Sequence, residues 1–401
     1  MTTSTPKRPP ARPWRFSLSD PRVAGLFWQV LVVAVAVAVI AFLWSNAVHN
    51  LSVRRISTGF AFLGREAGMP IADSWIDYTP KDTYLRAFIV GVVNTLRVAV
   101  IGIVLATVIG TLVGIARLSS NWLLARLAAV YVEVLRDLPL LLQLLFWYVL
   151  MQGLPAARQA FKPVEGVFLS NRGLILPSVP LSASNWWTIL ALVAGLTVFT
   201  IVRRRLIAQQ MLDGNARPAW PYALGLIVAL PALVSFLAGA SWRIVLPELR
   251  GFNFVGGLTL APEYFALLIA LVTYTSAFIA EIVRSGIQAV PRGQSEAAKA
   301  LGLKRGFVLQ HIVLPQALRY VIPGIVNSFI SLFKDTSLVS IVALFDLLGS
   351  LRASFSDPNW STPTTAFTGF AFAGMIYFVF CFGMSRYSLF VENRLNAHRR
   401  H

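Results

Sequence analysis

Two adjacent charged residues, Lys334 and Asp335, lie within a segment that is otherwise apolar. Adjacent residues on a helix point about 100° apart, so these two side chains are not expected to pair with each other. Asn327, Ser328 and Ser331 precede them at helical spacing, which predicts a polar stripe along the segment. In a membrane, such a stripe must face protein or a water-filled cavity. There, Lys334 could bind the carboxylate of a small zwitterion, and Asp335 could bind its ammonium group.

Further polar and ionisable groups near the ends of apolar segments are candidates for the same path. These candidates are Asn94, Arg97, Glu133, Arg136, Glu281 and Ser337. Alternatively, the charged groups form structural ion pairs between helices. Both interpretations remain open for Lys334 and Asp335. The structural one is favoured for the charged groups near span ends, because such side chains can reach the interface.

Catalysis and metal binding are not predicted. The four histidines, His49, His311, His398 and His401, lie outside the apolar segments, and the one cysteine, Cys381, lies inside one. An enzyme embedded in the membrane usually needs histidine, paired carboxylates or a metal. We therefore expect no catalytic residue, no metal site and no disulfide within the chain.

The composition is that of a membrane protein. Hydrophobic residues make up 56% of the 401 residues and charged residues 13%, whereas soluble domains contain about 25% charged residues. Stretches of about 20 apolar residues can cross a bilayer as helices. We predict an all-α fold with about eight spans: Ala24–Ala47, Phe88–Ala116, Leu138–Gly153, Trp186–Val202, Tyr222–Ala240, Tyr264–Val283, Val321–Gly349 and Ala366–Met384. The third is short and is expected to begin earlier, within Leu124–Leu135.

The net charge of +18 could indicate a nucleic-acid partner, but the basic residues lie between apolar runs and form no basic domain. With the N-terminal tail inside, the inner segments hold about twice as many basic residues as the outer ones. This bias predicts both termini in the cytoplasm and the loops Val48–Ala87 and Leu154–Asn185 outside. No fold is predicted for these loops, since neither has strong strand periodicity.

The most informative cytoplasmic segment runs from Glu296 to Pro315. Glu296–Leu301 favours helix, and Gly302 can end that helix. Lys304–His311 begins a second short helix, which Pro315 is expected to separate from the next span. The alanine side of the first helix is smooth enough to fit a groove on a partner protein.

The fixed residues of this segment are Glu296-Ala297-Ala298, then Gly302, then Ile312, Leu314 and Pro315. At every fixed position the pattern resembles the EAA loop of permeases from binding-protein-dependent ABC importers. The resemblance implies that residues 290–318 form the coupling loop that docks on the nucleotide-binding subunit, with these seven residues as coupling residues.

Four further segments narrow the resemblance to the polar amino acid permeases, the histidine/glutamate/arginine group. They are Asn94–Arg97, Tyr131–Leu141, Ala280–Ile287 and Lys334–Leu338. This chain has Arg136-Asp137-Leu138-Pro139 where the family usually has Arg-Gly-Thr-Pro, which weakens any transfer of function to Asp137 and Leu138. By length and layout, the chain is most similar to the larger permeases of general L-amino acid or glutamate/glutamine/aspartate/asparagine systems.

The resemblance implies a five-helix core of the type I ABC importer kind plus three added spans. The predicted layout is a disordered cytoplasmic tail over 1–22, an extra span and periplasmic loop over 23–87, and the first core part over 88–153. An insert with two extra spans follows over 154–260, then the second core part over 261–390 and a cytoplasmic tail over 391–401.

The resemblance implies a permease subunit of an ATP-driven importer of polar or diverse L-amino acids in the bacterial inner membrane. The implied partners are an ABC ATPase dimer, a related but non-identical second permease, a periplasmic amino acid-binding protein and membrane lipid, with no nucleic acid. No lysine follows a glycine as a P-loop requires, so ATP is expected on the partner, and this chain is expected to have no cofactor and no enzymatic activity. The alternative is a secondary transporter driven by an ion gradient. It would leave the EAA loop unexplained and would favour repeated halves, which are not visible.

Overall fold

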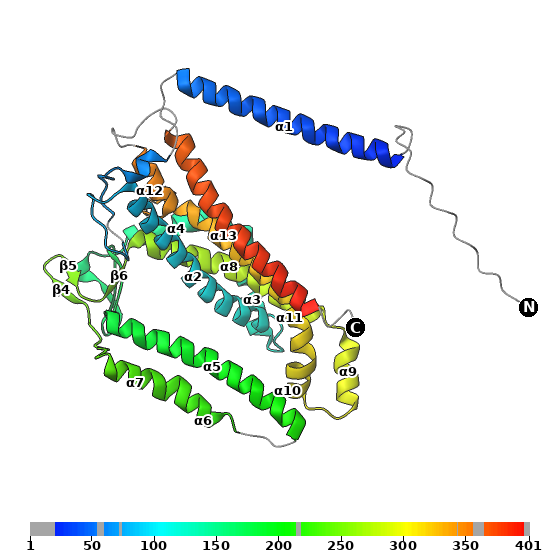
Figure 1. The fold of residues 1–401 in the computed structure, drawn as a ribbon. Coiled ribbons are helices and arrows are strands. Elements are labelled where there is room, and N and C mark those ends of the chain that lie inside the picture. The colour runs from blue at the N-terminus through cyan, green and yellow to red at the C-terminus, as the bar shows by residue number, and fades with distance from the viewer. Residues whose placement is uncertain are drawn as a thin grey trace, which may run out of the picture.

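The computed structural model describes residues 21–53, 60–71, 74–213, 218–342, 344–355 and 365–396, and helices dominate it (Figure 1). The predicted N-terminal tail over 1–22 lies outside these residues except for its last two, whereas residues 391–396 of the predicted C-terminal tail belong to the last helix. The long helices are α1 (Pro21–Val53), α2 (Tyr84–Ala116), α3 (Trp122–Asp137), α4 (Leu140–Gln152), α5 (Ala183–Asp213), α8 (Pro262–Gln288), α11 (Leu314–Asp335) and α13 (Thr365–Asn396). The shorter ones are α6 (Trp220–Ala223), α7 (Leu230–Leu237), α9 (Arg292–Ala300), α10 (Arg305–Val308) and α12 (Leu347–Ser354).

Within the described residues, six helical segments are long and apolar enough to cross a membrane: α1, α2, α5, the run from α6 to α7, α8 and α13. α3 and α4 would add a seventh span if they form one broken span, since the chain bends by 102° between them. The predicted number of eight is therefore not confirmed. The predicted seventh span, Val321–Gly349, is wrong as a continuous helix, because α11 ends at Asp335 and a 3-10 turn, η5 (Thr336–Ile341), follows it.

The bend between α3 and α4 explains why the third span looked short in the sequence. Pro139 precedes α4 and lacks the N–H that would continue the helical hydrogen bonding. The side chain of Gln143 fastens the bend, since its Nε2 donates to the carbonyl oxygens of Leu135 at 2.9 Å and Leu138 at 3.1 Å. The apolar stretch is thus divided into two helices at a steep angle.

The centre of the molecule is the pair α2 and α8, which lie side by side with α4 and α11 packed against them (Figure 1). A Cβ atom at Gly110 of α2 would lie 2.7 Å from the carbonyl oxygen of Ser276, and one at Gly114 would lie 2.6 Å from that of Ala280. Gly110 and Gly114 are four residues apart and share one face of α2 with Ala106, a spacing of small residues that favours close helix packing, and the two backbones approach closely there.

The added segments surround this core. α1 is exposed along its span and packs against none of the core helices described. α5 forms a hairpin with α6, a π-helical stretch η3 (Leu224–Ala229) and α7, and Gly195 lies directly against the carbonyl group of Leu226. These helices occupy the two extra spans predicted in the insert.

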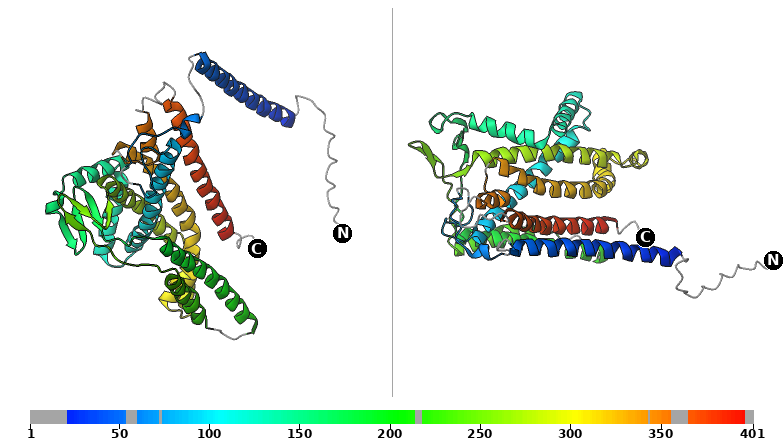
Figure 2. Two further views of the ribbon diagram at one scale, coloured as in Figure 1. Left: turned by 60° about the vertical axis from the view of Figure 1, so that its left-hand side comes forward. Right: turned by 90° about the horizontal axis from the view of Figure 1, so that it is seen from above.

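Short strands form in the insert, and the first three lie in the loop Leu154–Asn185, for which the sequence predicted no fold. β1 (Phe161–Val164), β2 (Val167–Ser170), β3 (Gly173–Leu176) and β6 (Leu258–Leu260) make an antiparallel sheet, and β4 (Glu248–Arg250) pairs with β5 (Asn253–Val255). Strands of three or four residues are too short to leave a periodic signal, and β6 is contributed from more than 80 positions beyond β3. The strands lie at one end of the helices, whereas α9 and the C-terminal end of α13 lie at the other (Figure 2).

Replacing Gly110 by Ala is expected to destabilise the chain by about 1–3 kcal/mol, because the new methyl group would overlap the backbone of α8. Gly102→Ala is the matched control on the same helix. Its Cβ would meet the side chain of Leu332 at 3.5 Å, an ordinary contact, and both variants gain the same helix propensity. Thermal unfolding in detergent measures the difference, and equal midpoints would contradict the close approach.

Candidate functional site

The loop predicted to couple to a partner begins with α9, whose C-terminal end has a well-defined cap. The N–H of Gly302 donates to the carbonyl of Lys299 at 2.9 Å, and the N–H of Leu303 donates to that of Ala298 at 3.2 Å. Together these bonds form a Schellman motif, which needs a left-handed residue after the helix. Gly302 has φ +75°, so the prediction that this position requires glycine is confirmed at the level of the backbone.

Glu296 lies in the middle of α9 and not at its N-terminal end, because the helix begins at Arg292. The sequence pattern favoured a helix that starts at Glu296, where the helix dipole would stabilise its carboxylate, and the observed helix starts four residues earlier. Glu296 and Ala297 are exposed, whereas Ala298 is buried against the following segment. Leu301, beside the cap, is 80% exposed and projects an apolar side chain from the tip of the loop.

The second helix of the loop does not stop at Pro315, as the sequence had suggested. α10 continues through a π-helical stretch, η4 (Leu309–Val313), directly into α11, and Pro315 occupies the first turn of α11. The wider π turn precedes the position where Pro315 cannot donate a hydrogen bond. The helical path from Arg305 to Asp335 is thus unbroken and roughly 45 Å long at 1.5 Å per residue.

Between α9 and η4 the surface of the loop is hollowed. The hollow of about 580 Å³ is lined by Gly293, Gln294, Ala297, Ala298, Leu301, Leu303, His311, Ile312 and Gln316. One hydrogen bond spans it, from Gln316 Nε2 to Gln294 Oε1 at 3.0 Å. Gln316 also donates to the carbonyl of Ile312, so the coupling residues of the two helices are held at a fixed spacing. Of the predicted coupling residues, Leu314 is exposed at the start of α11.

A second hollow, the polar hollow, lies between α8 and α11 and has a volume of about 680 Å³. Its α11 side is the predicted polar stripe: Asn327, Ser328, Ser331, Lys334 and Asp335. Its α8 side carries Tyr274, Thr275, Phe278 and Ile282, which the sequence analysis did not single out. Their spacing of three to four residues on a helix was the available signal, but it is also the signal of ordinary core packing.

Lys334 also lines a neighbouring hollow, of about 340 Å³, with Ser337 and residues of α13. Its side chain is exposed, and Asp335 is half-buried. Within the part of the chain that the structure describes, neither group forms an ion pair, in keeping with the expectation that the two do not pair with each other. The structure therefore places the cation and the anion on the walls of hollows.

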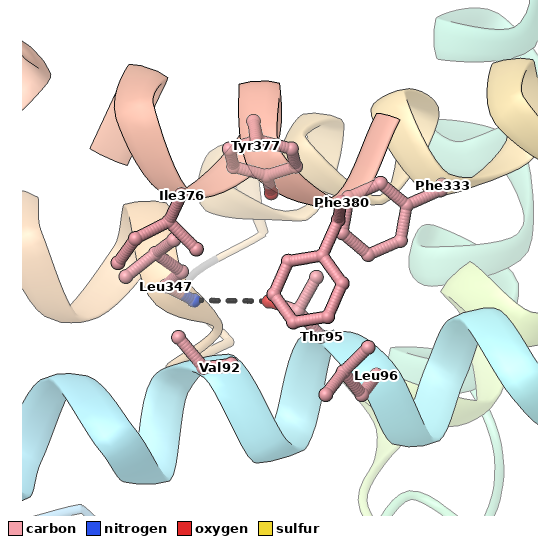
Figure 3. A pocket seen from close by; sticks show the side chains of 8 residues that line it. All are labelled: Val92, Thr95, Leu96, Phe333, Leu347, Ile376, Tyr377 and Phe380. Carbon is pink, nitrogen blue, oxygen red and sulfur yellow. Dashed lines mark hydrogen bonds between the residues drawn. The ribbon is translucent and has the colours of Figure 1, made fainter. Parts of the chain in front are cut away.

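Asn94, a predicted candidate for the substrate path on α2, contacts the segment leading into α12 and does not line the polar hollow. Asn94 is buried and donates to the carbonyl of Phe345 at 3.0 Å. Its neighbour Thr95 accepts from the N–H of Leu347 at 3.2 Å, in a small apolar space closed by Phe333, Tyr377 and Phe380 (Figure 3). Asn94 and Thr95 thus fasten the start of α12 to α2, away from the polar hollow.

Arg97 and Arg136 lie against aromatic rings. The guanidinium carbon of Arg97 is 4.3 Å from the ring centre of Trp75 and 4.2 Å from that of Tyr264. That of Arg136 is 5.1 Å from the ring centre of Phe278, a residue of the polar hollow. Cation–π contacts of this kind orient a guanidinium group.

The two acidic candidates on α3 and α8 differ in their partners. Glu281 forms ion pairs with Arg117, at the end of α2, and with Arg284, whose Nε donates to it at 3.1 Å. These pairs agree with the structural interpretation favoured for Glu281. Glu133 is exposed on α3.

Comparison with known proteins gives a consistent result. Residues 226–397 match the family described as binding-protein-dependent transport system inner membrane component. The chain is 45% identical to YhdX of Escherichia coli (strain K12), by name an amino-acid ABC transporter permease protein, over 83% of this chain and 85% of the relative. It is 40% identical to the general L-amino acid transport system permease protein AapQ of Rhizobium johnstonii, over 84% of each.

Two relatives come from one system of Rhodobacter capsulatus, both named as glutamate/glutamine/aspartate/asparagine transport system permease proteins. BztB is 36% identical over 86% of this chain and 88% of its own length. BztC is 35% identical over 60% of this chain and 54% of its own length.

Proposed function

Because this chain belongs to the family of amino-acid ABC transporter permeases, we propose that it couples ATP hydrolysis on a separate subunit to the uptake of polar L-amino acids. The observation that carries the proposal is the continuous helical path from the coupling loop to the polar hollow. A shift imposed on α10 at the partner surface would reach Lys334 and Asp335 along this helical path, which contains one proline inside α11, Pro323.

The polar hollow suits a zwitterionic solute. Lys334 supplies a cation for the carboxylate, Asp335 an anion for the ammonium group, and Asn327, Ser328 and Ser331 supply neutral hydrogen-bonding groups for a polar side chain. Charge-assisted contacts offset the loss of hydration when the amino acid leaves water.

A second permease chain completes the path in this proposal. In a single chain, Lys334 and Asn327 are exposed on a helix of the membrane domain, and a charged group facing lipid is costly. A neighbouring permease would cover that face. The paired names BztB and BztC support a related, non-identical partner. The ATPase dimer would dock on α9, and a periplasmic amino acid-binding protein would deliver substrate to the end that carries the strands.

We assign the α9 end to the cytoplasm and the strand end to the periplasm of the bacterial inner membrane, following the bias in basic residues. In a chain with Cys381→Ser, Glu165→Cys should react with a membrane-impermeant thiol reagent in intact cells. Glu296→Cys should react only after lysis. Both side chains are exposed in this chain alone, and lysed samples are labelled after removal of the ATPase, which would otherwise cover position 296. Labelling at position 296 from outside would reverse the assignment.

Gly302→Val is expected to uncouple ATP hydrolysis from uptake while the protein still inserts. A β-branched residue resists the left-handed conformation, at a cost of about 1–2 kcal/mol, and would misplace the tip of the loop. Uptake per ATP hydrolysed in proteoliposomes should fall several-fold. Glu296→Lys is expected to act in the same direction, through the exposed face of α9 and not through the helix dipole.

Gly306→Val is the matched control for this experiment. Gly306 lies only four residues further along the same loop and has no left-handed φ, and a Cβ atom added to it would have no neighbour within 4 Å. Uptake and ATP hydrolysis of this variant should stay near the wild-type values. Normal coupling in Gly302→Val and Glu296→Lys would remove this loop from the mechanism.

Lys334→Ala and Asp335→Ala are each expected to reduce uptake about tenfold or more, because each removes a charge-assisted contact worth about 1.5–3 kcal/mol. Assembly with the ATPase, measured by co-purification, should be preserved. Arg204→Ala, on an exposed part of α5, removes a cation away from the hollow and should leave uptake unchanged. Wild-type uptake in both hollow variants would exclude these residues from the path.

A further inference from the structure

Side chains from one helical turn of α2, Asn94–Arg97, contact three other segments of the chain. Asn94 and Thr95 hold the chain at Phe345 and Leu347, immediately before and within α12. Two positions further along the helix, Arg97 contacts Tyr264 at the start of α8 and Trp75 in the loop before α2. Tyr264 lies four positions after β6, so its contact with Arg97 lies toward the end of the bundle that carries the strands.

Residues 74–83, called the strap here, form the last part of that loop and lead directly into α2. The strap is fastened to residues 67–69 by hydrogen bonds from Ala67 N–H to the Asp82 carbonyl (2.8 Å) and from Gly68 N–H to the Pro80 carbonyl (2.9 Å). The Tyr78 hydroxyl donates to the carbonyl of Met69 at 2.8 Å. Ala67 is buried beneath these contacts, in the cluster formed with α2, α12 and α13.

The contacts around Arg97 differ in how readily they can open. The Arg97 and Tyr264 side chains are 6% and 1% exposed, so separating them would expose a buried charge and a buried ring. Trp75 covers Arg97 from the solvent side and is itself 58% exposed. Removing the Trp75 ring from Arg97 therefore breaks one cation–π contact of a side chain that is already more than half exposed. Trp75 is the member of this cluster that can leave at the lowest cost.

We propose that Trp75 on Arg97 is a latch that keeps the strap closed over the strand end of the core helices and opens during substrate entry. α2, α8 and α12 meet at the turn Asn94–Arg97, so any separation of their outer ends must loosen the contacts there. The latch biases the equilibrium toward the closed arrangement, and its loss shifts the population toward the open one. This proposal rests on the proposed function for the direction of substrate entry.

The test measures exposure of the residue beneath the strap. In a chain carrying Cys381→Ser and Ala67→Cys, purified with its partners, the rate of reaction with a water-soluble thiol reagent reports how often the strap opens. Trp75→Ala should accelerate the reaction about two- to tenfold, in line with the loss of one cation–π contact. Trp75→Phe retains a ring and should stay closer to the parent rate. Trp122→Ala removes an exposed tryptophan at the start of α3 and should not change the rate.

A second readout separates a latch from a merely structural contact. Trp75→Ala should raise ATP hydrolysis in the absence of binding protein and reduce its further stimulation by substrate, per assembled complex. An unchanged labelling rate overturns the latch, and so does faster labelling with wild-type dependence of ATP hydrolysis on binding protein. The labelling arm needs no transport assay, so failure of the proposed function would appear separately, as wild-type complexes without substrate-stimulated hydrolysis.

Discussion

The close contact between α2 and α8 is the constraint on which the rest of the structure depends. Within lipid, helices gain little from burying apolar surface against one another, so association relies on tight packing and polar contacts. Gly110 and Gly114 allow tight packing, because they carry no side chains that would separate the two backbones. The ion pair of Glu281 with Arg117 supplies a polar contact at one end, and the contact of Arg97 with Tyr264 does so at the other.

The pair α2 and α8 also supports α11. α11 packs on α8 along the polar hollow, and the helical path through α10 and η4 brings it to the loop at α9. Two π-helical stretches, η3 and η4, occur where a proline follows in the next turn, at Pro231 and Pro315. At Pro315 the sequence predicts a break and the helix continues instead, whereas Pro231 lies within Tyr222–Ala240, which the sequence predicts as one unbroken span. For α11, this continuity joins the predicted coupling loop to the polar hollow by one helical path.

The segments added to the core pack less closely than the core helices do. α1 and the α5–α7 hairpin make few contacts with the core helices, so their substitution patterns should follow the demands of lipid more than those of packing. The segment just before the strap is the exception among the added segments. Its residues Phe62, Ala67 and Ile71 are buried in a cluster with α2, α12 and α13, so this part of the addition is built into the core.

The sequence by itself determined the membrane class, most of the helices, the polar stripe on α11 and the coupling motif with its glycine. These features are local: they depend on apolar runs, helical spacing and a backbone conformation that only one residue type adopts easily. Tertiary structure alone decided that Asn94 and Thr95 hold α12, that Tyr274 and Phe278 complete the hollow, and that short strands pair across more than 80 residues of chain. It also decided that α11 ends at Asp335 and not fourteen residues later, near Gly349. The physical reason is that these outcomes depend on which partner a residue meets, and sequence spacing carries no information about a partner brought in from a distant segment.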